Sequence, residues 1–365
     1  MLNVIVEGAL LAFGFAMMPL LESAIPDVPA SDRTAIRIGA GKPFHDESEA
    51  SFGGNRPTIA LFDVGGYNLG AEDGGDKIQA GDYHDYSIKM PDDNRGQAEY
   101  ILIASGGNDA ICISYVTVTW PDGGVRSWYG DYAADCGGHW YYSHTITHPD
   151  GHKPKCTWID GDASNGLSTQ GFGYHIPDFT STPERDEQRK SNTDLLCGSQ
   201  PRFYQYEHLE RKHWLPVFDP PLEYDMQNGQ TDLDEAKVLV PGVARGEAPP
   251  LNAPQSEESK RRVKRNPVST RFSGQLVTSN DPHQSASELC LSGDAAGPDY
   301  ISFPEGLFCD MSEKQLWPLC REGLHHGCFD VETTTMRAGS GLQGRDEASG
   351  RAVPLKAYNK VQNWD

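Results

Sequence analysis

The segment ICISYVTVTWPDGGVRSWY, residues 111–129, has the pattern of two β-strands joined by a turn. From residue 116 to residue 120 apolar side chains alternate with threonines, so one face of the first strand is apolar and the other carries hydroxyls. Pro121-Asp122-Gly123-Gly124 is a strong turn signal, and residues 125–129 supply a return strand. The segment therefore predicts a β-hairpin.

Strand-like segments of the same kind recur between residues 57 and 179. Short apolar or alternating runs at 58–64, 83–90, 99–104, 140–147, 156–159 and 171–176 are separated by clusters of Gly, Asp, Asn and Pro. No long amphipathic helix comes between them, which disfavours a parallel α/β fold. Regularly spaced short strands predict an antiparallel β-sandwich or jelly roll over residues 31–180.

The charge of the chain is strongly negative. Its 365 residues include 31 Lys and Arg against 52 Asp and Glu, which gives a formal charge of −21. Residues 31–200 hold 13 basic and 25 acidic side chains, so 13 − 25 = −12 of that charge belongs to the first half. Because such a surface repels phosphate backbones, no nucleic-acid partner is expected.

The N-terminus predicts a secretory signal peptide over residues 1–30. Residues 9–21 run for thirteen positions without a charge, which suits a signal sequence and is too short for the ~20 residues of a spanning helix. Cleavage after Ala30 would place Val28 and Ala30 at the small-residue positions. The leader lacks Lys and Arg and contains Glu7, so a buried or amphipathic helix is the alternative. No membrane span is expected elsewhere.

The cysteines fall into two sets of four, and no CxxC pair occurs. That spacing argues against zinc ribbons and thioredoxin-type sites. Wide spacing behind a leader predicts disulfide bonds, with three possible connectivities for each set, whereas free buried thiols in a cytosolic protein are the alternative. The residues predicted to form disulfides are Cys112, Cys136, Cys156, Cys197, Cys290, Cys309, Cys320 and Cys328.

Composition divides the rest of the chain. Charged and proline-bearing residues dominate 181–265, which predicts an extension and a linker. The second set of cysteines lies within residues 266–330, which predicts a small disulfide-rich C-terminal module. Residues 331–365 contain Gly, Ser and Arg and predict a mobile tail, apart from a last apolar-polar stretch that ends at Trp364.

The linker ends in a basic hexad, KRRVKR, at residues 260–265. In a secreted protein, paired basic residues in an exposed linker are cleavage sites for secretory-pathway convertases. In an intracellular protein the same run would be a nuclear-localisation signal, and a solvated charge cluster is the third interpretation. The residues of the predicted processing site are Lys260, Arg261, Lys264 and Arg265.

Aromatic residues crowd positions 128–142 beside two aspartates. Aromatic faces flanked by carboxylates can hold sugars, whereas burial in the sandwich core is the alternative for the same rings. The candidate ligand-binding residues are Trp128, Tyr129, Asp131, Tyr132, Asp135, Trp140 and Tyr142.

Histidines in the same region offer a candidate metal site at His144, His148 and His152. The alternative is ordinary surface histidines, because Pro149-Asp150-Gly151 interrupts the array. No nucleophile-elbow, phosphate-loop or HExxH motif occurs, so no catalytic residue is assigned and no cofactor is expected. A glycosidase needs only two carboxylates and remains the enzymatic alternative.

Residues 106–143 and 289–320 resemble secreted cysteine-containing proteins of filamentous ascomycete fungi that lack an assigned activity. The resemblance covers about a fifth of the chain and carries no catalytic motif. It implies a secreted, effector-like binding protein that acts at a cell surface, on a wall polymer or on a host target. A polysaccharide-active hydrolase and a nuclear protein are the alternative functions.

Overall fold

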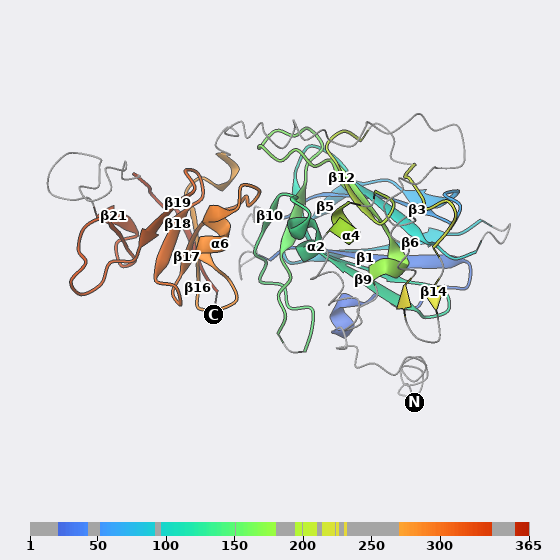
Figure 1. The fold of residues 1–365 in the computed structure, drawn as a ribbon, viewed down its shortest axis with the longest axis horizontal. Coiled ribbons are helices and arrows are strands. Elements are labelled where there is room, and N and C mark those ends of the chain that lie inside the picture. Colours follow the sequence, from blue (N-terminus) through green and yellow to red (C-terminus); the bar gives the residue numbers. More distant parts are fainter. Residues whose placement is uncertain are drawn as a thin grey trace.

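The computed structural model is mainly β and describes residues 21–42, 52–91, 96–149, 151–179, 194–198, 200–209, 214–222, 224–225, 230–231, 270–337 and 355–364. It has two lobes, an N-terminal β-sandwich and a smaller C-terminal lobe that begins at Thr270 (Figure 1). The predicted fold class, a sandwich followed by a small disulfide-rich module, is confirmed.

Two antiparallel sheets form the sandwich. One has the strand order β10-β11-β8-β1-β6, with β9 also paired to β8. Its strands are β1 (Arg33–Ala40), β6 (Tyr83–Lys89), β8 (Ile111–Thr119), β9 (Val125–Tyr129), β10 (Trp140–Tyr141) and β11 (Cys156–Ile159). The second sheet has the order β13-β12-β7-β3-β4, from β3 (Thr58–Phe62), β4 (Asn68–Glu72), β7 (Tyr100–Ala104), β12 (Gly171–His175) and β13 (Phe203–Tyr206).

Short elements complete the N-terminal lobe. A two-stranded ribbon pairs β2 (Gly54–Arg56) with β5 (Gly75–Ile78), and another pairs β14 (Tyr224–Asp225) with β15 (Gln230–Thr231). The helical turns are η1 (Glu22–Ala24), α2 (Gly130–Asp135), η2 (Ile176–Phe179) and α4 (Asp194–Cys197). None of the helices in the described residues is long and apolar enough to cross a membrane.

The predicted hairpin is confirmed as β8 and β9, with Val118 opposite Arg126. Gly123 supplies the positive φ of the turn, +84°, and the Asp122 carboxylate accepts a 2.8 Å hydrogen bond from the Gly124 amide. All nine residues of β8 are buried, because β8 has partners on both edges and its hydroxyl face is also covered. The alternating pattern therefore predicted the strand, but the face that carries the threonines is buried and not exposed to solvent.

The sandwich core lies between the two sheets. Ile38 and Val116 from the first sheet and Ile101 and Phe172 from the second belong to one cluster, and each is fully buried. The Trp128 ring, also fully buried, stacks on Phe172 with centroids 4.5 Å apart. The end of the hairpin is therefore fixed inside the core.

The sandwich extends past residue 180, so the extension predicted over 181–265 starts later in the structure than in the prediction. Strand β13 lies within that range and pairs with β12, and Cys197 is bonded to Cys136. Leu215, Val217 and Phe218 are buried against the outer face of the second sheet. These apolar residues need a surface to cover, so the sandwich continues at least to Leu222.

The C-terminal lobe is a five-stranded sheet with the order β19-β18-β17-β16-β22 and a hairpin, β20-β21. Its elements are η3 (Thr270–Phe272), β16 (Gln275–Ser279), α6 (Ala286–Leu291), β17 (Asp299–Ser302), β18 (Leu307–Asp310), β19 (Gln315–Pro318), β20 (Cys328–Asp330), β21 (Thr335–Arg337) and β22 (Lys360–Trp364). Strand β16 runs parallel to both β17 and β22.

The prediction of a mobile tail over 331–365 is wrong for residues 331–337, and the last apolar-polar stretch, which that prediction excepts, forms a strand. Strand β21 pairs with β20, and β22 forms an edge of the five-stranded sheet. Trp364 is only 1% exposed, so the last strand is anchored by an apolar side chain.

Two turns of this lobe have the same hydrogen-bond pattern and backbone conformation. Asp310 ends β18 and accepts hydrogen bonds from the amides of the second and third residues after it, and Asp330 does the same at the end of β20. The fourth residues, Lys314 and Thr334, both have φ of +51°. Equal spacing and equal backbone geometry make these turns structural repeats.

Residues 21–26 pack on the sandwich. The Leu21 amide donates to the Thr147 carbonyl, and Arg37 donates a 2.6 Å hydrogen bond to the carbonyl of Ser23. Ala24 is buried in a cluster with Tyr115 and Tyr129. A cut after Ala30 would remove these contacts, whereas a cut before Leu21 would keep all of them; the signal peptide itself stays a prediction.

Candidate functional site

Most of the rings predicted to form a ligand surface are buried. Trp128, Trp140 and Tyr142 are exposed by 3% or less, and Tyr129 by 9%. The prediction of an exposed aromatic surface is therefore wrong for these four residues. Trp128 fills the sandwich core, whereas Trp140 and Tyr142 meet residues of the C-terminal lobe.

The surface between the lobes is an aromatic cluster, which we call the interlobe joint. Tyr141 lies 6.3 Å from Tyr300 and 6.5 Å from Trp364, ring centre to ring centre. On the other side of the joint, Trp158 lies 5.3 Å from Phe272. The rings of the joint include Phe52, Tyr141 and Trp158 from the sandwich and Phe272, Tyr300 and Trp364 from the C-terminal lobe, and Trp140 and Tyr142 belong to the same buried cluster.

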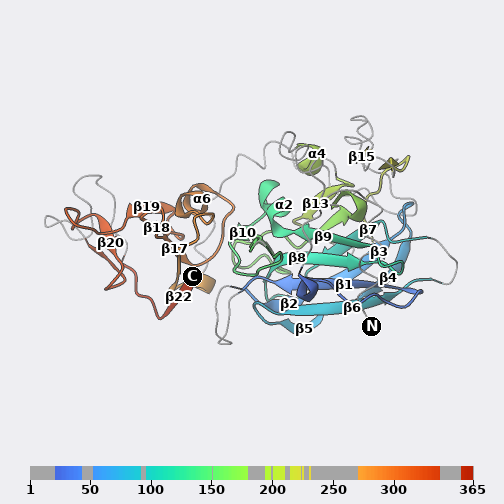
Figure 2. The same cartoon turned by 90° about the horizontal axis from the view of Figure 1, so that it is seen from below.

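Backbone hydrogen bonds also cross the joint. The Trp140 amide donates to the Asp294 carbonyl at 3.2 Å, and the Ala296 amide donates to the Trp140 carbonyl at 2.8 Å. Trp140 thus forms a parallel β-bridge with Ala295. Figure 2 shows β10 on the side of the sandwich that faces the C-terminal lobe, so the two lobes are joined through main chain as well as side chains.

Ion pairs surround the apolar part of the joint. Lys155 donates a 2.5 Å hydrogen bond to Glu288, which also accepts a hydrogen bond from the Tyr142 hydroxyl. Lys153 lies 3.1 Å from Asp281, and both side chains of this pair are less than a fifth exposed. Half-buried pairs with direct contacts fix orientation more than they add binding energy.

Arg271 anchors the start of the C-terminal lobe on the sandwich. Its guanidinium donates to the carbonyls of Gly53 and Ala110 and to the Asp109 carboxylate, at 2.8–3.2 Å. It also lies over the Trp158 ring, 5.4 Å from the ring centre. One cation therefore satisfies three acceptors across the joint.

The remaining predicted ligand residues lie at the edge of the sandwich, on α2. Tyr132 and Asp131 are half-buried, and Asp135 is exposed. Burial raises the pKa of the Asp131 carboxyl, and the nearby His152 opposes that rise. Asp135 lies near Lys155 and Glu288 at the rim of the joint, whereas the rings of Trp140 and Tyr142 are buried inside it.

Two of the three candidate metal ligands lie together, since the rings of His148 and His152 are 5.6 Å apart, centre to centre. His144 stacks on Trp364, with ring centres 5.5 Å apart. His148 contacts the Tyr129 hydroxyl at 3.3 Å, and His152 lies 4.0 Å from Asp131. In the described part of the chain no group of three or more His, Cys, Asp or Glu residues has the geometry to hold a metal ion.

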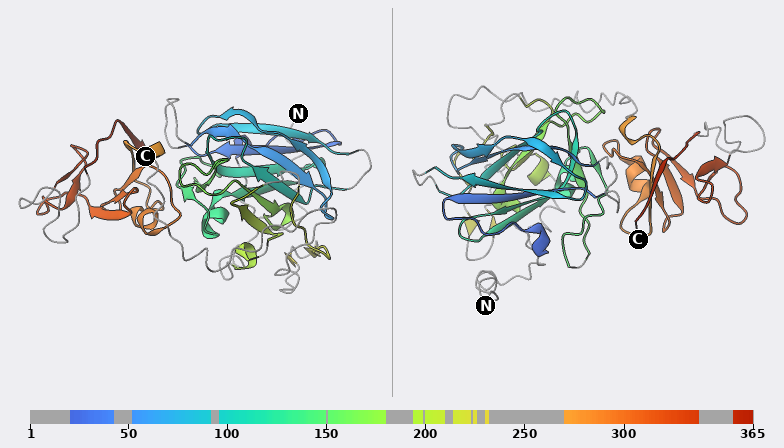
Figure 3. Two further views of the ribbon diagram at one scale, coloured as in Figure 1. Left: turned by 90° about the horizontal axis from the view of Figure 1, so that it is seen from above. Right: turned by 180° about the vertical axis from the view of Figure 1, so that it is seen from behind.

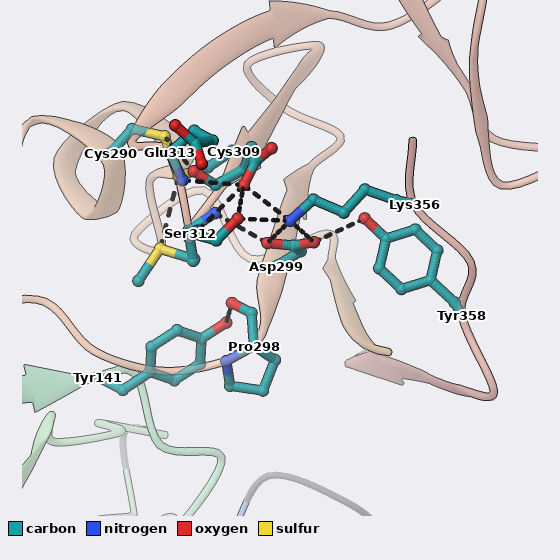
Figure 4. Close-up of polar contacts among 11 residues, drawn as sticks. Tyr141, Cys290, Pro298, Asp299, Cys309, Ser312, Glu313, Lys356 and Tyr358 are labelled. Carbon is teal, nitrogen blue, oxygen red and sulfur yellow. Dashed lines mark hydrogen bonds and ion pairs between the residues drawn. A yellow bond between two sulfur atoms is a disulfide. The ribbon is translucent and has the colours of Figure 1, made fainter. Parts of the chain in front are cut away.

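A buried acid-base cluster lies behind the joint in the C-terminal lobe (Figure 4). The Lys356 ammonium lies 3.0 Å from an Asp299 carboxylate oxygen and 2.8 Å from one of Asp310. Tyr358 donates a 2.7 Å hydrogen bond to Asp299. Burial raises the pKa of Asp299, although the lysine opposes it. Two carboxylates thus share one cation, which ties residues 356–358 to β17 and β18.

A second buried cluster lies in the sandwich. His175 contacts Asp178 at 2.9 Å and Glu99 at 3.4 Å, and Arg202 lies 3.3 Å from Asp178. Burial by itself lowers the pKa of His175, but the carboxylates of Asp178 and Glu99 outweigh it and hold the pKa above its ordinary value. His175 is 2% exposed, so the cluster stabilises the fold and does not face a ligand.

All eight cysteines are paired, and each bond stays within one set of four. The bonds are Cys112–Cys156, Cys136–Cys197, Cys290–Cys309 and Cys320–Cys328. The prediction of disulfides is confirmed, and the connectivity that the sequence left open is resolved. The predicted processing residues Lys260, Arg261, Lys264 and Arg265 lie outside the described residues.

Sequence reasoning missed the residues that matter most at the joint. Tyr141, Trp158 and Arg271 carry no motif, and nothing in the chain marks Trp364 as a partner of a ring more than 200 positions away. A usable signal was present in the C-terminal apolar stretch, because an alternating strand that ends in Trp needs a surface to bury it.

No protein-family model matches the chain, and no curated protein matches it. Among solved structures it is similar to a LOX deletion variant crystallised anaerobically in complex with arachidonate, at 12% identity and a TM-score of 0.23 over 45% of this chain. Another structure of that deletion variant gives 14% identity and a TM-score of 0.20. The chain spans about a fifth of the length of these proteins, 19% in both cases. Likeness at this level carries no argument about function.

Proposed function

We propose that the protein is a secreted, disulfide-stabilised binding protein without catalytic activity, acting on a surface polymer outside the cell. The observation that carries the proposal is the pairing of all eight cysteines into four disulfides. Disulfides at this density form and persist in oxidising compartments and are rare in the cytosol. The apolar leader of the sequence supports the same location.

The pairing and burial of the charged groups support a binding function over a catalytic one. In the described residues, ion pairs hold the buried clusters around His175 and around Lys356, although Arg202 Nη2 and Asp310 Oδ2 have no hydrogen-bond partner. The aspartates and the histidine of these clusters are less than a tenth exposed, so a substrate in solvent does not reach them. The same charges are well suited to hold a rigid scaffold.

A ligand would bind at aromatic rings that are exposed, and these differ from the rings that the sequence predicted as ligand-binding. Tyr67 and Tyr83 are each 45% exposed, and Phe303 is 38% exposed. Tyr83 has Arg37 over its ring at 3.8 Å, and Asp85 is its second neighbour along β6. Arg37 covers one face of the Tyr83 ring and is itself paired with Asp85, so a sugar would stack on the part of the ring that Arg37 leaves exposed.

The test begins with the secreted protein. Culture supernatant should contain the chain in oxidised form, and non-reducing peptide mapping should return the four disulfides above. The purified protein should then be retained by an insoluble cell-wall polysaccharide, with retention lost in Tyr83→Ala and kept in the control Tyr115→Phe, whose ring is buried.

Two results would overturn the proposal. An intracellular chain with reduced cysteines would remove the secreted location and would revive the nuclear alternative. Release of soluble sugars from the polysaccharide by the wild-type protein would show a hydrolase. In that case Asp131→Asn and Asp135→Asn would be the first variants to test.

A further inference from the structure

We infer that the two lobes remain together as a non-covalent two-chain complex when the chain is cut in the segment between them. The proposed secretion and processing matter to this inference only because they would supply the cut in the cell. Its physical basis is the interlobe joint. In the two views of Figure 3 the lobes lie side by side, and the joint is formed by residues on either side of the segment 232–269.

A cut would leave no covalent bond between the lobes. Two disulfides close within the sandwich and two within the C-terminal lobe. Hydrolysis after Arg265 adds one water across the peptide bond, leaving a carboxylate on Arg265 and an amine on Asn266. The complex would then depend entirely on non-covalent contacts.

The apolar part of the joint resembles a domain core more than a surface contact. Phe52, Tyr141, Trp158 and Tyr300 are fully buried, Trp364 is 1% exposed and Phe272 is 7% exposed. An aromatic side chain buries about 150–250 Å². Separation would expose the ring surfaces that face the other lobe, and obligate interfaces are the class that buries such surfaces.

Buried polar groups make separation still less favourable. The Trp158 indole donates a 2.8 Å hydrogen bond to the Ala296 carbonyl, and the Tyr141 hydroxyl donates to the Pro298 carbonyl at 2.9 Å. The Trp140 indole donates to the Ser292 hydroxyl at 3.2 Å. Each donor has its acceptor in the other lobe, so the polar groups of the two surfaces are matched.

The C-terminal strand is part of the same joint. Trp364, at the end of β22, lies against Tyr141 and His144 of the sandwich. Both ends of the C-terminal lobe therefore contact the sandwich, since Arg271 holds the other end. A lobe held at its first and last residues has little freedom to swing away once the linker is cut.

The experiment cuts the full-length protein in solution. A protease recognition sequence is inserted between Ser259 and Lys260, the folded protein is cut to completion, and the sample is run on gel filtration at micromolar concentration. Denaturing gels should show two fragments. We expect a single native peak that contains both fragments in equal amounts; two separate peaks would overturn the inference.

A matched pair of variants ties the result to the joint. Arg271→Glu places a negative charge beside Asp109 and should raise the dissociation constant of the cut protein at least tenfold. Arg337→Glu breaks an ion pair within the C-terminal lobe and should leave it unchanged. If Arg271→Glu does not fold, Tyr141→Phe, which removes the hydrogen bond to the Pro298 carbonyl in the other lobe, replaces it. Equal dissociation constants for the joint and control variants would contradict the assignment.

The design separates the inference from the proposed processing. The mass of the naturally secreted protein shows whether cells cut the basic hexad. If they do not, the processing proposal fails, while the inserted site still decides whether the lobes stay bound.

Discussion

The hydroxyl of Tyr141, on β10 of the sandwich, donates a 2.9 Å hydrogen bond to the carbonyl oxygen of Pro298 in the C-terminal lobe. Both groups lie inside the joint, and Tyr141 is fully buried. The bond links residues that are 157 positions apart in sequence. It shows in one contact how the two halves, each with its own disulfides, form one structure.

Removal of this hydroxyl tests the energy of the joint. Tyr141→Phe keeps the ring and leaves the Pro298 carbonyl without a donor, which should lower the free energy of unfolding by about 1–3 kcal/mol. Chemical denaturation measures the loss. Tyr83→Phe, with a ring that is 45% exposed, is the control and should change stability by less than about 0.5 kcal/mol. Equal effects would contradict a buried joint.

The Lys356 cluster predicts a charge-dependent loss of stability. Lys356→Met leaves the buried carboxylates of Asp299 and Asp310 without their cation, which should cost about 2–3 kcal/mol after allowance for the partial exposure of the lysine. Because burial raises the pKa of Asp299, acid should neutralise it and shrink the loss. Denaturation at pH 7 and at about pH 4.5 checks this, and a loss that grows in acid would contradict it.

Stability should depend on pH through His175. Its pKa is raised in the folded protein relative to about 6.5 in the unfolded chain, so the protonated ring stabilises the fold fully below that value. This contribution is lost as the pH rises through the folded pKa, by at most about 1.4 kcal/mol per pH unit for one proton. The advantage of wild type over His175→Gln should therefore shrink above neutral pH, and a constant difference from pH 5 to 9 would contradict the assignment.

The repeated turns predict a stabilising substitution. Thr334 has φ of +51°, a conformation that costs a β-branched residue about 1–2 kcal/mol and costs glycine little. After the entropy of glycine in the unfolded chain is subtracted, Thr334→Gly should raise stability by about 0.5–1 kcal/mol. Thr335→Gly, within β21, should lower it. A thermal unfolding scan of both variants shows whether each substitution raises or lowers the stability of the protein.

Local patterns predicted the sandwich strands well because alternation and turn residues act over a few positions. The hairpin at 111–129 is the clearest case. Strand β1 was missed because Arg33 and Arg37 interrupt its apolar pattern; Arg37 is buried only because Asp85 and the Ser23 carbonyl satisfy it. That partner set depends on the tertiary fold and leaves no local signal.

The joint could not be predicted for a different reason. The local sequence around an aromatic residue such as Trp140 does not show whether its ring contacts a ligand, the core of its own lobe or another lobe. What decides its place is a partner more than 150 positions away, as with Ser292 and Ala295. The even division of cysteines indicated two units, but it held no information about how they meet.

Hydrogen exchange in the intact protein tests the central claim, that both lobes share one stable joint. The Ala296 and Trp140 amides donate to carbonyls of the opposite lobe, so peptides that cover residues 140–142 and 294–298 report on it. We predict that these amides exchange as slowly as those of β8, in the sandwich core. Exchange as fast as in an exposed loop, with β8 still protected, would show that the lobes separate and would contradict the account.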